Sequence, residues 1–271
     1  FPYTTLFRSI AITSLAARGA TTGGRAAALV VGTYWDFRCG VTDTWPSTCS
    51  DSGSAHVYTV NSSGAWAWNG TLKARVVRDG AWCGTSVAVA GDVVVVGCSG
   101  DPSPSTAVDV GEGWENGSYV GAVHAWRLDA ANASQSVREA YLKAFRAANL
   151  QLFGSSVAVA VNATHEVVAV CASGSATGAP YGDMSASLAM PYDVPVNGSG
   201  KQNNEGEVWT FVHAVGGGAG AWRAAHRVKP PVGVMQEQFG RTLTAAATPA
   251  GQVVLGVGTR VGCKGYVVVL P

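Results

Sequence analysis

The stretch that decides the fold is Phe153-Gly154-Ser155-Ser156-Val157-Ala158-Val159-Ala160, which follows the shorter element Leu142-Lys143-Ala144. From the last residue of the short element to the glycine of the long one, the offset is ten residues. Two further copies keep this order and this offset. Because a repeat of fixed spacing indicates an array of similar structural units, these copies divide the chain. The other copies are Leu72-Lys73-Ala74 with Cys83-Gly84-Thr85-Ser86-Val87, and Val228-Lys229-Pro230 with Phe239-Gly240-Arg241-Thr242-Leu243.

Each copy continues with the same succession of patterns. A short polar turn follows the long element, then an apolar run, which together predict a β-hairpin. After a variable loop comes a stretch with apolar residues at every second position, which predicts a third strand. The short element lies in a fourth strand. The apolar runs are residues 27–31, 93–96, 167–170 and 253–257, and the alternating strands are residues 53–58, 121–126, 206–211 and 265–270.

A unit of four antiparallel strands repeated along a chain is typical of a β-propeller blade. The sequence therefore predicts an all-β fold, a β-propeller-type array of about four four-stranded antiparallel blades that forms an incomplete ring. We place the blades at about residues 10–80, 81–150, 151–236 and 237–271, and the degraded first copy at Thr13-Ser14-Leu15-Ala16-Ala17. Residues 137–148 have a helix-forming composition, but the repeat spacing predicts a strand there.

Residues 1–9, Phe-Pro-Tyr-Thr-Thr-Leu-Phe-Arg-Ser, resemble the in-frame translation of a common sequencing-library adapter. We therefore expect them not to be native and leave them out of the analysis of the fold. The remaining residues, 10–271, are expected to be a fragment of a longer protein.

The repeated elements resemble those of the FG-GAP repeat family, the integrin-α-type propeller repeats. Phe153-Gly154 and Phe239-Gly240 match its first motif, and Val96-Gly97-Cys98 stands where the family has Gly-Ala-Pro. The resemblance implies a secreted or cell-surface propeller that recognises other proteins or glycans. Family members often carry an Asp-rich calcium loop in the first hairpin turn. The matching turns here hold no more than one acidic residue each, so we expect no metal site.

The composition narrows the possible partners. Charged residues make up 13% of the chain and the net charge is +1, with no basic block. Binding of nucleic acid needs a concentrated Lys and Arg footprint, so we exclude nucleic acid as a partner. No stretch holds 18 uninterrupted apolar residues, so we expect no transmembrane segment.

Asparagine sequons and cysteines indicate the secretory pathway. The alternative is that turns rich in Gly, Ser and Asn produce sequons by chance. Cys39 and Cys49 bracket one loop, and Cys83 and Cys98 lie near the open end of one predicted hairpin, so both pairs are candidate disulfides. Cys171 and Cys263 have no obvious partner. The six candidate glycosylation sites are Asn61, Asn69, Asn116, Asn132, Asn162 and Asn197.

The sequence contains no catalytic motif that we identify, and we expect no enzyme activity, no cofactor and no metal. His56 and His124 share a strand position with Trp209, which favours packing over catalysis. Trp66, Trp126, Trp209 and Trp222 recur in register and are predicted to fill the spaces between blades. We expect a non-catalytic extracellular or cell-surface module that recognises a protein or a glycan through its variable loops. The alternatives are an accessory propeller of a larger secreted enzyme and, less favoured, a lectin. The variable loops are residues 33–52, 99–118, 173–205 and 259–264.

Overall fold

The computed structural model describes residues 9–15, 26–39, 49–60, 64–112, 117–129, 131–145, 149–174, 204–217, 221–229, 237–260, 262 and 264–270. They form small antiparallel sheets, each made of strands that are consecutive in the chain. The first sheet contains β1 (Ser9–Leu15), β2 (Ala26–Thr33), β3 (Ser54–Val60) and β4 (Trp66–Leu72). The second contains β5 (Cys83–Ala90), β6 (Val93–Cys98), β7 (Ala122–Arg127) and β8 (Val137–Leu142), with the short helix η1 (Ala133–Gln135) before β8. The third contains β9 (Phe153–Val161), β10 (His165–Ala172), β11 (Glu207–Ala214) and β12 (Arg223–Val228), and the fourth contains β13 (Thr242–Ala247), β14 (Val253–Gly258) and β15 (Gly265–Leu270).

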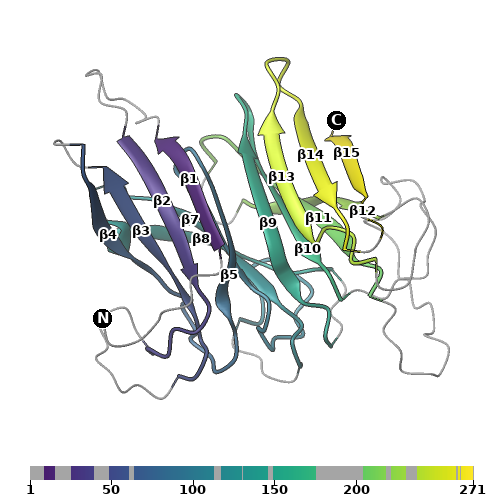
Figure 1. The fold of residues 1–271 in the computed structure, drawn as a ribbon, viewed down its shortest axis with the longest axis horizontal. Coiled ribbons are helices and arrows are strands. Elements are labelled where there is room, and N and C mark those ends of the chain that lie inside the picture. Colours follow the sequence, from purple (N-terminus) through teal and green to yellow (C-terminus); the bar gives the residue numbers. More distant parts are fainter. Residues whose placement is uncertain are drawn as a thin grey trace.

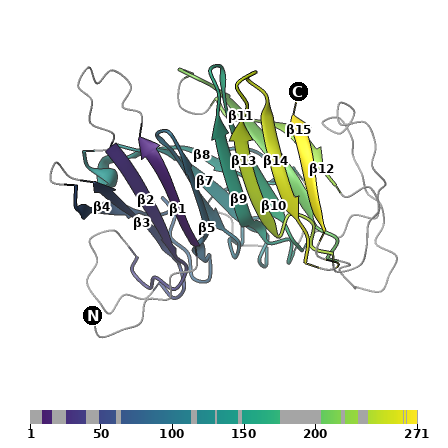
Figure 2. The ribbon, with the colours of Figure 1, turned by 45° about the horizontal axis from the view of Figure 1, so that its top comes forward.

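The all-β prediction and the four repeated antiparallel units are confirmed. The sheets lie side by side, from β1–β4 at one end of the molecule to β13–β15 at the other (Figures 1 and 2). The first strands β1, β5, β9 and β13 contact one another in succession. Within the described residues this row of sheets does not close into a ring. We call the three interfaces between neighbouring sheets the first, second and third junctions.

Two local predictions have different outcomes. Residues 137–142 form the strand β8, as the repeat spacing predicts, despite their helix-forming composition. The position of the degraded first copy is wrong, because Ser9 pairs with Gly32 as Ser86 pairs with Gly97 in the second sheet. Ser9, and not Ser14, therefore takes the place of Ser86. The adapter origin of residues 1–9 stays a prediction; residues 1–8 lie outside the described residues, and Ser9 is the first residue of β1.

The same pair of backbone hydrogen bonds holds each junction. In the first junction, the Trp82 amide donates to the Asp51 carbonyl at 3.0 Å and the Cys83 amide to the Ser52 carbonyl at 3.1 Å. Asp51 and Trp82 both have a positive φ, 52° and 54°, a conformation that residues with a side chain seldom adopt. Because both bonds recur at each junction, they explain why the repeat spacing is kept. The second junction pairs Leu152 with Tyr119 and Phe153 with Val120, and the third pairs Gln238 with Asn204 and Phe239 with Glu205.

Neighbouring backbones approach closely beside these bonds. A Cβ atom on Gly97 would lie 2.0 Å from the Gly154 carbonyl oxygen, so only glycine fits there. The Ser86 hydroxyl donates to the same carbonyl at 2.7 Å, as the Ser9 hydroxyl does to Gly84 at 3.0 Å. This contact explains the glycine of the Val96-Gly97-Cys98 element by packing alone.

The core consists of one apolar cluster in each junction. Along β6, Val93 and Val95 face the second junction, whereas Val94 and Val96 face the first. All four valines are at most 1% exposed. A strand buried on both faces needs a continuous apolar run, which is the pattern that the sequence shows. Each such valine contributes about 1.5 kcal/mol or more through burial.

The structure contains the two disulfides Cys39–Cys49 and Cys83–Cys98. Cys83 and Cys98 are register partners on β5 and β6, so that disulfide ties the open end of this hairpin. Cys171 is a free, buried cysteine, and Cys263 lies outside the described residues. Two disulfides are typical of a protein that folds in an oxidising compartment. Within the described residues, no helix is long and apolar enough to span a bilayer.

Candidate functional site

The three complete sheets share one irregular position between their third and fourth strands. The strand pairing skips one residue of the fourth strand, which is Asn69, Glu139 or Ala225. Next to it on the third strand stand Thr59, Arg127 and Val212, which pair with equivalent positions of β4, β8 and β12. We call these positions corners and number them by the junction at which they lie. The first corner is Thr59 with Asn69, the second is Arg127 with Glu139, and the third is Val212 with Ala225. The corners share a backbone but differ in their side chains, so they are where the repeated units can differ in chemistry.

The first corner is closed by neutral hydrogen bonds. The Asn69 side-chain amide donates to the Thr59 hydroxyl at 3.0 Å and to the Ala131 carbonyl at 3.4 Å. The carbonyl oxygen of the same side chain accepts from the Ala133 amide. Asn69 therefore links β4 to the loop that precedes β8 in the next sheet.

The second corner is closed by a network of ion pairs around Arg127. This guanidinium binds both oxygens of Glu166 at 2.8 Å and both oxygens of Glu139 at 2.9 and 3.0 Å. It also donates to Asp92 at 2.7 Å. Glu166 is fully buried and lies 3.0 Å from Nδ1 of His213, so the network spans the second junction. The hydrogen bonds that Arg127 donates to Glu166, and then those to Glu139 and Asp92, raise the pKa of Arg127 above its usual value despite the opposing effect of burial.

The carboxylates of Glu139 and Glu166 and the ring of His213 lie close enough together to hold a cation. The guanidinium of Arg127 already supplies the positive charge there, because it forms paired hydrogen bonds with both carboxylates. A second group, Cys83, Cys98 and His124, also lies within such a distance, but both of its sulfur atoms are used in a disulfide.

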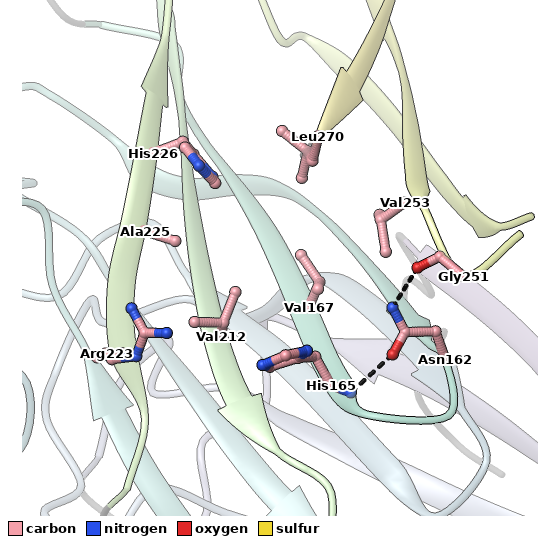
Figure 3. A pocket seen from close by; sticks show the side chains of 10 residues that line it. All are labelled: Asn162, His165, Val167, Val212, Arg223, Ala225, His226, Gly251, Val253 and Leu270. Carbon is pink, nitrogen blue, oxygen red and sulfur yellow. Dashed lines mark hydrogen bonds between the residues drawn. The ribbon is translucent and has the colours of Figure 1, made fainter. Parts of the chain in front are cut away.

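The third corner is open. Val212 and Ala225 stand where Arg127 and Glu139 close the second corner, and neither side chain is long or polar enough to bridge the junction. A cavity of about 260 Å³ lies there, between the third and fourth sheets. Figure 3 shows the side chains that line it: Asn162, His165, Val167, Val212, Arg223, Ala225, His226, Gly251, Val253 and Leu270.

The lining of this cavity combines apolar walls with basic groups. Val167, Val253 and Leu270 are buried and supply apolar surface from both sheets. Arg223 and His226 stand on β12, on the other side of the space from Val253 and Leu270 (Figure 3). Burial, together with the nearby charge of Arg223, lowers the pKa of His226.

Asn162 fixes one edge of the cavity. Its side-chain amide donates to the Gly251 carbonyl at 2.6 Å, across the third junction. Its carbonyl oxygen accepts from the His165 amide at 2.7 Å, which holds the turn between β9 and β10 (Figure 3). The edge is therefore built from both sheets and is tied in place.

No protein-family model matches the chain, and a search of the curated proteins finds no match. The proposals below therefore rest on the repeat and on the geometry of the corners.

The structure places the candidate glycosylation sites in different surroundings. Asn69 and Asn162 both donate hydrogen bonds across a junction through their side-chain amides, to the carbonyls of Ala131 and Gly251. Asn132 is exposed and caps the helix η1, where its carbonyl oxygen accepts from the Ser134 amide at 3.1 Å. The remaining sequons, Asn61, Asn116 and Asn197, lie outside the described residues.

We expect a glycan on Asn132 when the chain is expressed in a eukaryotic secretory host, and low occupancy of Asn69 and Asn162. The side-chain nitrogen that would carry a glycan is already used inside the fold at Asn69 and Asn162. Peptide mass spectrometry after enzymatic deglycosylation measures the occupancy of each site. Asn132→Gln is the control that removes its signal. Equal occupancy at Asn69 and Asn132 would contradict the prediction.

The aromatic and histidine residues are mostly structural. His124 is buried between the rings of Trp126 and Tyr141, and burial lowers its pKa to about 3. Trp209 and Trp222 are also buried, as predicted. Trp66 is 47% exposed, so the prediction that it fills a space between blades is wrong. Trp222 packs into the junction with the preceding sheet, whereas no sheet among the described residues precedes β1–β4 to cover Trp66.

The lysine of the short repeated element is a residue whose role the sequence analysis missed. Lys143 is buried, and its ammonium group lies 3.3 Å from Asp101 and donates to the Ser103 carbonyl at 2.7 Å and to the Gly121 carbonyl. Burial lowers the pKa of Lys143 to about 8, against the opposing effect of Asp101. These bonds hold the loop after β6 against β8. The long variable loop, 173–205, lies almost wholly outside the described residues.

Proposed function

We propose that the chain is a non-catalytic recognition module of the β-propeller type, of the FG-GAP-like class, in an extracellular or cell-surface setting. The observation that carries the proposal is that the same pair of backbone hydrogen bonds recurs at all three junctions. The loop sequences and the side chains at the corners differ from one junction to the next. A rigid repeated frame that presents different side chains is suited to recognition.

Three further observations support the extracellular setting and the role in binding. The two disulfides are typical of secreted domains. Asn132 offers an exposed sequon. The third corner opens a cavity with apolar walls and a few polar groups, which is the usual character of a ligand site.

The test is a binding screen of the full chain, secreted from a eukaryotic host with its disulfides verified by mass spectrometry. The folded chain is presented to a glycan array and to a library of extracellular protein domains. We expect saturable binding to at least one probe, and loss of that binding after reduction of the disulfides. A chain with the expected β-sheet circular dichroism that binds no probe would argue against the proposal.

A further inference from the structure

We propose that the cavity at the third corner binds a small organic acid, whose carboxylate pairs with Arg223 and whose apolar body contacts Val167, Val253 and Leu270. The volume of about 260 Å³ is slightly below the roughly 300 to 1,000 Å³ of typical ligand pockets, so it suits a small molecule. The proposal holds whether or not the variable loops contact a macromolecule.

Arg223 gives the lining its positive charge, and no Asp or Glu is among the residues that line the cavity. An anionic ligand is therefore favoured over a cationic one. Arg223 forms no ion pair with any residue that the structure describes, unlike Arg127 at the second corner. A carboxylate in the cavity would pair with this guanidinium through two charge-assisted hydrogen bonds.

A comparison of the second and third corners indicates the position that the ligand carboxylate would take. At the second corner, the carboxylate of Glu139 occupies the irregular position of the fourth strand and binds a guanidinium. At the third corner, Ala225 takes that position and leaves space beside Arg223 and His226. A ligand carboxylate would therefore replace an acidic group that the repeat has at the preceding junction.

The rest of the lining selects an acid with an apolar body. Val167 of β10, Val253 of β14 and Leu270 of β15 form an aliphatic wall opposite Arg223 and His226. His226 has its Nδ1 atom 3.1 Å from the Thr210 hydroxyl, which orients the ring. A hydrophilic anion such as inorganic phosphate would leave the aliphatic walls without contact, whereas an aryl or branched alkyl acid would cover them.

The experiment compares phenylacetate with phenylacetamide, which has the same shape without the charge. Isothermal titration of the full chain, at neutral pH and low salt, measures both affinities. We expect phenylacetate to bind about tenfold or more tightly than phenylacetamide. Equal affinities, or no binding of phenylacetate to the folded chain, would overturn the proposal.

Three variants locate the binding. Arg223→Gln is expected to weaken phenylacetate binding about tenfold and to leave phenylacetamide unchanged. Arg260→Gln, which removes an exposed arginine that does not line the cavity, is the matched control and leaves both affinities unchanged. The double variant Val212→Arg with Ala225→Glu builds the second corner into the third and is expected to abolish binding of both compounds.

Thermal unfolding and circular dichroism show which of these variants keep the fold. Because Arg223 is exposed, Arg223→Gln tests the proposal even if the double variant does not fold. Undiminished binding of phenylacetate by folded Arg223→Gln protein would place the acid outside this cavity and overturn the proposal.

Discussion

Replacing Lys143 by Met lowers the free energy of unfolding by about 3 to 5 kcal/mol, the range found when one partner of a buried ion pair is removed. The variant leaves the Asp101 carboxylate buried beside Tyr141 without its cation. It also removes the donor to the carbonyls of Ser103 and Gly121. Urea unfolding monitored by circular dichroism measures the loss.

Lys73→Met is the matched control, because Lys73 has the same place in the first sheet and lies 3.5 Å from Asp36. Asp36 keeps a second cation, since Arg38 binds both of its oxygens at 2.9 and 2.8 Å. We therefore expect a smaller loss for Lys73→Met. If the two variants lose the same stability, then the unpaired charge of Asp101 is not the cause.

The pH dependence gives this prediction a second readout. The pKa of Lys143 is about 8 in the folded chain and 10.5 ordinarily, so between these values the unfolded chain binds more protons. Stability therefore rises with pH across that window through this group. Below about pH 8 the contribution is constant. The Lys143→Met variant lacks this rise, so the stability difference between the wild type and the variant grows from about pH 8 upward.

Replacing Arg127 by Met is expected to cost about 3 to 5 kcal/mol at neutral pH, again because a buried charge loses its partner. Three carboxylates, those of Asp92, Glu139 and Glu166, would then face one another without the guanidinium. Denaturant unfolding at neutral pH, monitored by circular dichroism, measures the deficit.

A rescue variant separates this network from a simple loss of packing. Arg127→Val with Glu139→Ala copies Val212 and Ala225 of the third corner. Glu166→Gln copies Gln252, which directly precedes the apolar run of β14 as Glu166 precedes that of β10. Replacing a charge together with the buried carboxylates that bind it costs much less than removing the charge alone. Asp92 keeps its carboxylate in this variant, but its side chain is 32% exposed and can be hydrated. We therefore expect the triple variant to recover much of the stability lost in Arg127→Met. Arg223→Met, on the exposed side of the third corner, is the control and should change stability by no more than about 0.5 kcal/mol. A triple variant as unstable as Arg127→Met would refute the role of the ion pairs.

Local patterns were sufficient to predict the individual sheets. The hairpins follow from apolar runs separated by short polar turns, and the two disulfides join cysteines that are close in the chain or face each other in one hairpin. The strand β8 shows that the spacing of the repeat outweighs intrinsic propensity, since residues 137–142 have a helical composition but complete a sheet. The degraded first copy of the repeat was misplaced because so short a stretch matches more than one register.

The candidate site could not be predicted in the same way. The roles of Arg127, Val212 and Ala225 depend on which residues of the next sheet face them, and that arrangement is set across a junction. Aligning the repeats by strand register would have exposed the contrast between Arg127 and Val212. The consequence of that contrast is a cavity with Arg223 on its wall, and this cavity forms only when the neighbouring sheet is in place.

The sequence by itself determined the secondary structure, the antiparallel sheets and their number, because these depend on periodicity and turns within about 70 to 86 residues of chain. Tertiary structure alone decided that Lys143 is a buried cation, that Gly97 lies against a neighbouring carbonyl, and that Trp66 is exposed. It also decided that one corner is filled by ion pairs and another is open. The physical reason is that burial and charge pairing depend on side chains brought together from different sheets, whereas strand formation depends on neighbours along the chain.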